Sequence, residues 1–161
     1  MIVRRTEEKD LDAVMNIYAK AKKFMDKSGN PDQWVDGYPS LELVKYDIEN
    51  DGYVIIDNNI ILGVFVFIEN AQKDVYNSID GMWLNNEPYA VIHRCATLST
   101  GKGVGQFLFD WCWQKHNNIR IDTHKDNKPM ANILKRNNYV YCGKVYYPTK
   151  NGERLAYHKT T

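Results

Sequence analysis

Several features that mark specialised protein classes are missing from this chain. Among its 161 residues are three cysteines, an odd number without a CxxC pair, which argues against a disulfide framework. Buried, reduced thiols in a cytoplasmic protein are the expectation instead. The four histidines show neither HExxH nor His-x3-His spacing, so no metal site is expected.

The chain also has no excess charge of one sign and no long apolar run. Lys and Arg total 21 against 20 Asp and Glu, without the basic stripe of a nucleic-acid-binding protein. The most apolar stretch, residues 60–68, is about half a membrane span and contains Gly63. Two arginines near the start have no apolar segment behind them, so no secretory signal is expected. Nucleic acid and membrane are therefore not expected partners.

What is present is the composition of an ordinary globular domain. Hydrophobic residues make up 43% of the chain and charged residues 25%. The length fits one domain over residues 1–161, large enough to fold around its own core. The oligomeric state, monomer or homodimer, stays open.

Periodicity and turn residues predict a mixed order of strands and helices along the chain. Helices are expected from residue 11 to the break at 28–31, over 40–48, after the glycine-rich loop at 101–105, and from a cap at 126–127 to about 137. Strands are expected at 2–3, 53–56, 60–68, 89–98, 119–123, 139–147 and 153–159. The pattern is that of an α/β (α+β) protein.

The most informative local feature is the loop Gly-Lys-Gly-Val-Gly at residues 101–105, between an expected strand and an expected helix. Alternating glycines allow backbone N–H groups to converge on a phosphate at a helix N-terminus. A tight turn without ligand is the alternative. The loop does not fit GxxxxGK[ST], and Gln106 stands where a dinucleotide fingerprint needs its third glycine.

The glycine loop, residues 119–130 and the strand entry at 138–143 together resemble the GNAT superfamily of acyl-CoA-dependent N-acyltransferases. The resemblance covers essentially the whole chain, and the strings at 28–31 and 122–124 resemble a bacterial subgroup that brings no substrate with it. It implies a single mixed, mostly antiparallel sheet with helices on both faces. Strands 89–98 and 119–123 would form its splayed parallel pair.

The resemblance also implies how acetyl-CoA would bind. Backbone amides from Gly101 to Gln106 would hold the pyrophosphate, while the strand at 93–95 would pair with the pantetheine arm and Asn127 would hydrogen-bond to it. Thr100 stands where the family has Gln or Arg, which removes one long side chain. The residues implied to bind the cofactor are His93, Arg94, Cys95, Gly101, Lys102, Gly103, Val104, Gly105, Gln106 and Asn127.

The implied reaction moves an acetyl group from acetyl-CoA to a primary amine, on a small molecule or a peptide, by direct attack on the thioester. Many family members carry a general-acid Tyr where this chain has Leu134, seven residues after the Asn. A non-catalytic acyl-CoA-binding or regulatory domain is therefore an alternative, and a nucleotide-binding protein using the same loop is a weaker one. Replacement proton donors would be Tyr141, Cys142 or Tyr146.

Two residues are candidates for the base that takes a proton from the amine. Asp122 lies five positions before Asn127, where some similar enzymes have a Glu. His93 has an ordinary pKa of about 6.5, which suits the task. Arg94, in mid-strand, should need a carboxylate partner, and Asp122 is the first candidate; such a pair would make Asp122 structural.

Aromatic residues in or beside loops are candidates for the wall of an acceptor pocket. The alternative is that they cover the core. They are Trp34, Tyr38, Trp83 and Tyr89.

Overall fold

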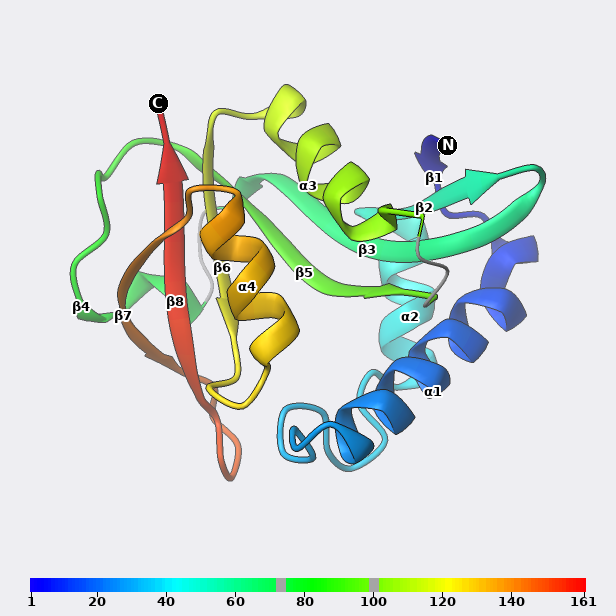
Figure 1. Ribbon diagram of the computed structural model, residues 1–161, viewed down its shortest axis with the longest axis horizontal. Helices are drawn as coiled ribbons and strands as arrows, with labels where there is room; N and C mark the ends of the chain where they lie inside the picture. The colour runs from blue at the N-terminus through cyan, green and yellow to red at the C-terminus, as the bar shows by residue number, and fades with distance from the viewer. Residues whose placement is uncertain (72–74, 99–101) are drawn as a thin grey trace.

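The computed structural model describes residues 1–71, 75–98 and 102–161 (Figure 1). Its elements are β1 (Ile2–Arg5), a helical turn (Glu8–Asp10), α1 (Leu11–Lys27), α2 (Leu41–Glu49), β2 (Gly52–Asp57), β3 (Ile60–Ala71), a second turn (Val75–Asn77), β4 (Asp80–Gly81), β5 (Tyr89–Thr97), α3 (Val104–Lys115), β6 (Asn118–Thr123), α4 (Lys128–Arg136), β7 (Val140–Tyr146) and β8 (Glu153–Thr160). None of the helices in these ranges has the length and apolar character to span a bilayer.

The strands form one sheet in the order β1-β2-β3-β5-β6-β8-β7-β4. Every pairing is antiparallel except that of β5 with β6, which is parallel. These two strands pair only through Ala90 with Ile119 and Val91 with Arg120. Beyond this short ladder they diverge, as Figure 1 shows. The splayed parallel pair and the mostly antiparallel sheet are thus confirmed.

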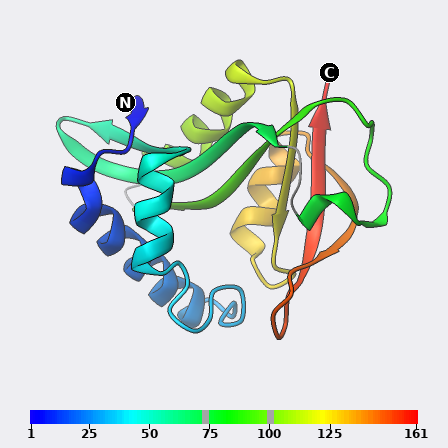
Figure 2. The same cartoon turned by 180° about the vertical axis from the view of Figure 1, so that it is seen from behind.

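Helices cover both faces of the sheet, as expected from the sequence (Figures 1 and 2). Alternation along the strands divides the core. Val54 and Val64 join the cluster under α1 and α2, whereas Ile55 and Phe65 join the cluster under α3 and α4. Successive strand residues point to opposite faces, so one apolar run serves both layers.

Three local signals set the boundaries of elements, and the cap near residue 127 was predicted from the sequence. The Ser40 hydroxyl accepts a hydrogen bond from the Leu43 N–H and caps α2. Asn127 caps α4 in the same way, with a proline in the first turn. Asn58 and Asn59 adopt positive φ values of 50° and 62° in the β2–β3 hairpin.

The two-residue strand β4 is not expected from the sequence. It pairs with β7, placing Gly81 opposite Gly143, and both glycines have positive φ. A Cβ on Gly143 would collide with the carbonyl oxygen of Asp80. The close backbone approach therefore requires glycine at this position.

The segment before β5 is tied to the sheet by a buried histidine. His158 on β8 is fully buried. Its Nδ1 accepts from the Leu84 N–H at 3.1 Å, and its Nε2 lies 2.6 Å from Asn118 Oδ1. One donor and one acceptor match a neutral imidazole. Burial, with a smaller effect from the Arg120 charge, lowers the pKa of His158 to about 4.

This histidine should make stability depend on pH. Because its folded-state pKa lies below the unfolded value, the unfolded state takes up the proton first as pH falls through about 6.5. His158 should therefore cost about 3 kcal/mol of unfolding free energy between pH 6.5 and its folded pKa of about 4. Urea unfolding across this range measures the loss. His158→Gln should flatten it, and an unchanged slope in the variant would contradict the assignment.

A second prediction concerns Leu134, which is fully buried in the core between α4 and the sheet. Leu134→Ala should lower the unfolding free energy by about 2–5 kcal/mol, measured by urea denaturation. The exposed Leu41 is the control, since Leu41→Ala should change it by less than about 0.5 kcal/mol. A selective loss of activity at unchanged stability would show that Leu134 has a chemical role.

Candidate functional site

The site is centred on an irregularity in β5. The register of β5 against β3 shifts beside Arg94, whose φ is +46°. The hydroxyl of Tyr18 on α1 donates a hydrogen bond of 2.7 Å to the Arg94 carbonyl oxygen. An extra strand residue turns backbone groups out of the ladder. Here the bulge lies in the stretch of β5 that has already left β6.

The side chain of Arg94 crosses to α2. Its Nε and Nη2 donate to the two carboxylate oxygens of Asp47 at 2.8 and 2.7 Å, a two-pronged ion pair that leaves both side chains largely buried. The expected pairing of Arg94 with Asp122 is therefore wrong. The bulge directs the guanidinium towards the helix layer, and β5 and β6 are no longer paired at this point.

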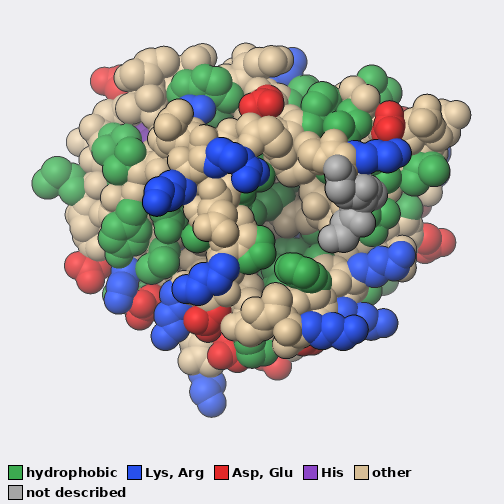
Figure 3. Space-filling model, viewed as in Figure 1, with side chains coloured by type: hydrophobic (Ala, Val, Ile, Leu, Met, Phe, Trp, Pro, Cys, Tyr) green, Lys and Arg blue, Asp and Glu red, His purple; other side chains and the backbone are tan. Residues whose placement is uncertain are grey.

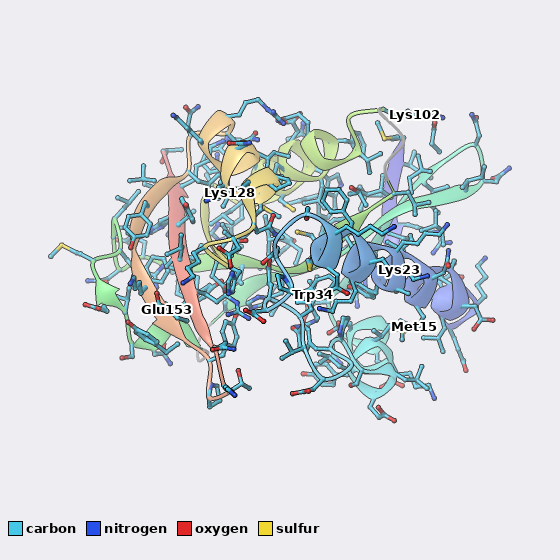
Figure 4. The ribbon with its side chains drawn as sticks, turned by 60° about the horizontal axis from the view of Figure 1, so that its bottom comes forward. Met15, Lys23, Trp34, Lys102, Lys128 and Glu153 are labelled. Atoms are coloured by element: carbon cyan, nitrogen blue, oxygen red, sulfur yellow. The ribbon has the colours of Figure 1, made fainter. Side chains whose placement is uncertain are left out.

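A cavity of about 590 Å³ opens beside the bulge, and we call it the Asp122 pocket. Its walls come from the loop between α1 and α2, from β5 and β6, and from the β7–β8 hairpin. Trp34 and Tyr38 line it from the first of these loops. Figure 4 shows Trp34 at the centre of the molecule, between α1 and the β7–β8 hairpin that carries Glu153.

Asp122 on β6 accepts two hydrogen bonds from tyrosines. The hydroxyls of Tyr76 and Tyr147 both donate to its Oδ2 at 2.6 Å. Within the described residues Oδ1 has no hydrogen-bond partner. Burial raises the pKa of Asp122, and this outweighs the opposing effects of the two hydroxyls and of the Arg154 charge. A carboxyl group in this state can take up a proton more readily than an exposed one.

The second candidate base, His93, lines the same pocket. Its ring lies 5.9 Å from the ring of Tyr76, centroid to centroid. The structure therefore brings His93 and Asp122 to one cavity with Tyr76 in contact with both.

A second cavity, of about 730 Å³, lies between α1, the end of β5, α3 and α4, and we call it the α1–α4 groove. Lys20 and Arg136 contribute cationic side chains to its lining. Figure 3 shows a hollow on this face with Lys and Arg side chains around it. The groove and the Asp122 pocket share lining residues, among them Cys95 and Asn127. The two cavities meet at the bulge.

The described part of the glycine loop lies at the N-terminus of α3. Gly103 is the N-cap residue with a φ of +72°, and a Cβ there would meet nothing within 4 Å. Gly105 lines the α1–α4 groove. Gly101 and Thr100 lie outside the described residues. The first N–H groups of α3 are thus presented beside the groove, where a helix terminus favours an anion.

The other side chains of the loop have structural contacts. Val104 is buried in the core. Lys102 is exposed, with its Nζ 3.6 Å from an Asp57 carboxylate oxygen. The Gln106 side chain donates to Asn137 Oδ1 at 2.7 Å. The side chains of Val104 and Gln106 are thus engaged within the fold, whereas the Lys102 side chain is exposed.

Asn127 lies at the junction of the two cavities with its side chain already engaged. Its Oδ1 accepts from the Met130 N–H at 3.1 Å, and its Nδ2 donates to Gln33 Oε1 at 2.8 Å. Gln33 thereby links the α1–α2 loop to the start of α4.

The remaining candidates from the sequence are the possible proton donors and two of the loop aromatic residues. Among the described residues that line the pocket or the groove, Tyr141, Cys142, Tyr146, Trp83 and Tyr89 do not occur. Instead, the rings of Trp83 and Tyr89 lie 4.3 and 3.9 Å from the guanidinium carbon of Arg120. They cover the buried cation of Arg120 on β6, an interior strand of the sheet.

Comparison with known proteins identifies the family of the chain. No protein-family model matches the chain, and no curated protein sequence matches it. Solved structures do. An acetyltransferase of the GNAT family from Streptococcus agalactiae is 31% identical with a TM-score of 0.88, over 99% of this chain and 95% of that one. The chain belongs to the GNAT family.

Two further structural neighbours cover 99% of this chain. A Staphylococcus aureus protein assigned as an acetyltransferase is 26% identical with a TM-score of 0.72 and is covered over 99% of its length. A GNAT-family acetyltransferase from Listeria monocytogenes is 16% identical with a TM-score of 0.65 and 94% covered, which shows the shared fold. Acyltransferase activity is thereby supported in general terms.

Several residues that line or flank the two cavities were not predicted from the sequence. They are Lys20, Gln33, Asp47, Tyr76, Arg136, Tyr147 and Arg154. Each comes from an element distant in sequence from the glycine loop, and no local motif surrounds it. Among the described residues, no cluster of three His, Cys, Asp or Glu side chains could hold a metal ion.

Proposed function

We propose that the protein is an N-acyltransferase that moves an acetyl group from acetyl-CoA to a primary amine. The observation that carries the proposal is the meeting of two cavities at the β5 bulge. One cavity has cationic side chains and a helix N-terminus, and the other contains a carboxyl group of raised pKa. Such a pair suits one substrate with phosphates and another with an ammonium group.

In this proposal acetyl-CoA occupies the α1–α4 groove. The N–H groups at Gly103 to Gln106 hold the pyrophosphate, and Lys20 and Arg136 add positive charge nearby. The pantetheine arm lies in the wedge between β5 and β6, where extended amides can pair with strand backbone. Asn127 lies at the edge of this wedge, where its side chain is hydrogen-bonded to Met130 and Gln33.

The acceptor amine enters through the Asp122 pocket. Asp122 Oδ1 takes one proton from the ammonium group, and the neutral nitrogen attacks the thioester carbon. A backbone N–H of the bulge, at Arg94 or Cys95, stabilises the oxyanion. When the C–S bond breaks, the second proton of the nitrogen leaves with the thiolate, giving the amide and free coenzyme A. Tyr76 and Tyr147 hold the carboxyl group in place.

Cys95 does not compete as a nucleophile in this scheme. Burial raises the pKa of its thiol to about 11, so the thiol is protonated near neutral pH. Direct transfer without an acyl-enzyme is the expected route. His93 is the second candidate for the base, since it lines the same pocket.

The test is to incubate the protein with acetyl-CoA and a panel of primary amines and to follow the release of free thiol. Release should depend on the amine and should saturate with both substrates. A non-catalytic acyl-CoA-binding domain is the second candidate, favoured by the burial of Leu134 where many relatives have Tyr. Binding of acetyl-CoA without thiol release from any amine would favour that candidate and contradict the proposal.

A further inference from the structure

Arg154 at the start of β8 is a buried cation with no carboxylate partner. Its side chain is 9% exposed, and no carboxylate oxygen of the described residues lies within 4 Å of it. Nη1 donates to the carbonyl oxygens of Asn151 and Glu153 at 2.8 Å, and Nη2 donates to that of Gln33 at 2.7 Å. Burying a guanidinium without an opposing charge is costly.

Part of this guanidinium is available to a ligand. Arg154 lines the Asp122 pocket. Its Nε–H and one Nη2–H have no hydrogen-bond partner among the described residues, and Nε is not sealed from solvent. Nε and Nη2 together form an edge that matches the two oxygens of a carboxylate.

The other charges of the pocket do not account for Arg154. Arg94 is neutralised by Asp47. Asp122 is close enough for the Arg154 charge to act on its carboxyl group, but its hydrogen bonds come from two tyrosines. Asp36 and Lys150 also line the pocket, but both are exposed to solvent, which screens their charges.

We propose that the acceptor amine carries a carboxylate, which the Nε–Nη2 edge of Arg154 binds while Asp122 faces the amine. This inference rests on the proposed acetyl transfer and adds the substrate class. The volume of about 590 Å³ has room for an amino acid and also for larger amines, and Trp34 and Tyr38 offer an apolar wall for a side chain. Amino acids are the simplest acceptors that carry both an amine and a carboxylate.

The experiment compares each standard amino acid with its own carboxamide as acceptor, using acetyl-CoA and thiol release. The carboxamide keeps the amine and the side chain and removes only the charge. The parent should acetylate at least one amino acid with kcat/KM about 10–100-fold above its carboxamide. Arg154→Gln should lose this preference by lowering the rate with the acid and leaving that with the carboxamide. Equal use of both acceptors by the parent would overturn the proposal.

Two controls separate recognition from structure. Lys125→Gln removes one positive charge near the site but outside the pocket lining, and should keep the preference. Arg154→Lys keeps the charge without the two-pronged geometry, and should retain folding with an intermediate preference. Losses of equal size for acid and carboxamide in the Arg154 variants would mean that Arg154 only ties the hairpin to the loop at Gln33.

A binding measurement distinguishes failure of the carboxylate site from failure of the proposed acetyl transfer. Calorimetry on the coenzyme A-saturated protein compares N-acetylated amino acids with N-acetylated amino-acid carboxamides and needs no turnover. Preferential binding of the acids by the parent, lost in Arg154→Gln, supports the carboxylate site even if no thiol is released. Absence of that preference overturns it, whatever the activity.

Discussion

Replacing Asp122 by Asn should lower kcat/KM by about 10²–10⁴-fold with any accepted amine. The amide cannot take the proton from the ammonium group, and it keeps nearly the same shape between Tyr76 and Tyr147. The parent's rate should fall as pH drops through the pKa of Asp122, which burial raises above its ordinary value. The variant should lose this acidic limb. Initial rates across pH, with acetyl-CoA affinity measured separately, provide the check.

Two further variants decide whether Asp122 is the base. His93→Gln should keep the acidic limb if Asp122 takes the proton and should lose it if His93 does. Asp32→Asn, in the exposed part of the α1–α2 loop, is a matched control that should behave like the parent. An unchanged limb in both the Asp122 and His93 variants would leave proton removal to solvent and contradict the assignment.

Gly103→Val should abolish the stabilisation of the protein by coenzyme A. A ligand that binds only the native state at 100 times its dissociation constant stabilises it by about 2.7 kcal/mol. At Gly103 the φ of +72° disfavours a β-branched residue, and the added side chain would occupy the open space before α3. The pyrophosphate would lose the N–H groups at the helix terminus. Thermal shift with and without coenzyme A measures this loss.

The melting temperature without ligand reports backbone strain in this variant and is read separately from the ligand-induced shift. Pantetheine, which lacks the pyrophosphate, is the control ligand, and its smaller shift should be the same in parent and variant. Equal shifts of parent and variant with coenzyme A would show that the loop does not hold the pyrophosphate.

The fold could be predicted because its signals are local. Asn127 caps α4, and paired asparagines turn the β2–β3 hairpin, so the residue types alone indicate the element boundaries. The strand β4 could not be predicted, because a strand of two residues shows no hydrophobic periodicity. Its pairing depends on the close approach of Gly81 and Gly143, which are far apart in the sequence.

The site could be predicted only in part, because its charges are paired through space. The candidates from the glycine loop to Asn127 were predicted from one continuous stretch of sequence. The partner of Arg94 was not predicted, because the left-handed backbone at the bulge directs the Arg94 side chain to Asp47 on α2. Arg154 was missed for the same reason, since its significance depends on the absence of a nearby carboxylate.

The most direct test of the two-cavity account is a crystal structure of the protein with acetyl-CoA. The account predicts pantetheine in the wedge between β5 and β6, with the pyrophosphate against the N–H groups that follow Gly103. The thioester should lie beside Cys95, with its carbonyl carbon accessible from the Asp122 pocket. Acetyl-CoA bound with its pyrophosphate away from the α3 N-terminus, or with its thioester outside the junction of the two cavities, would contradict it.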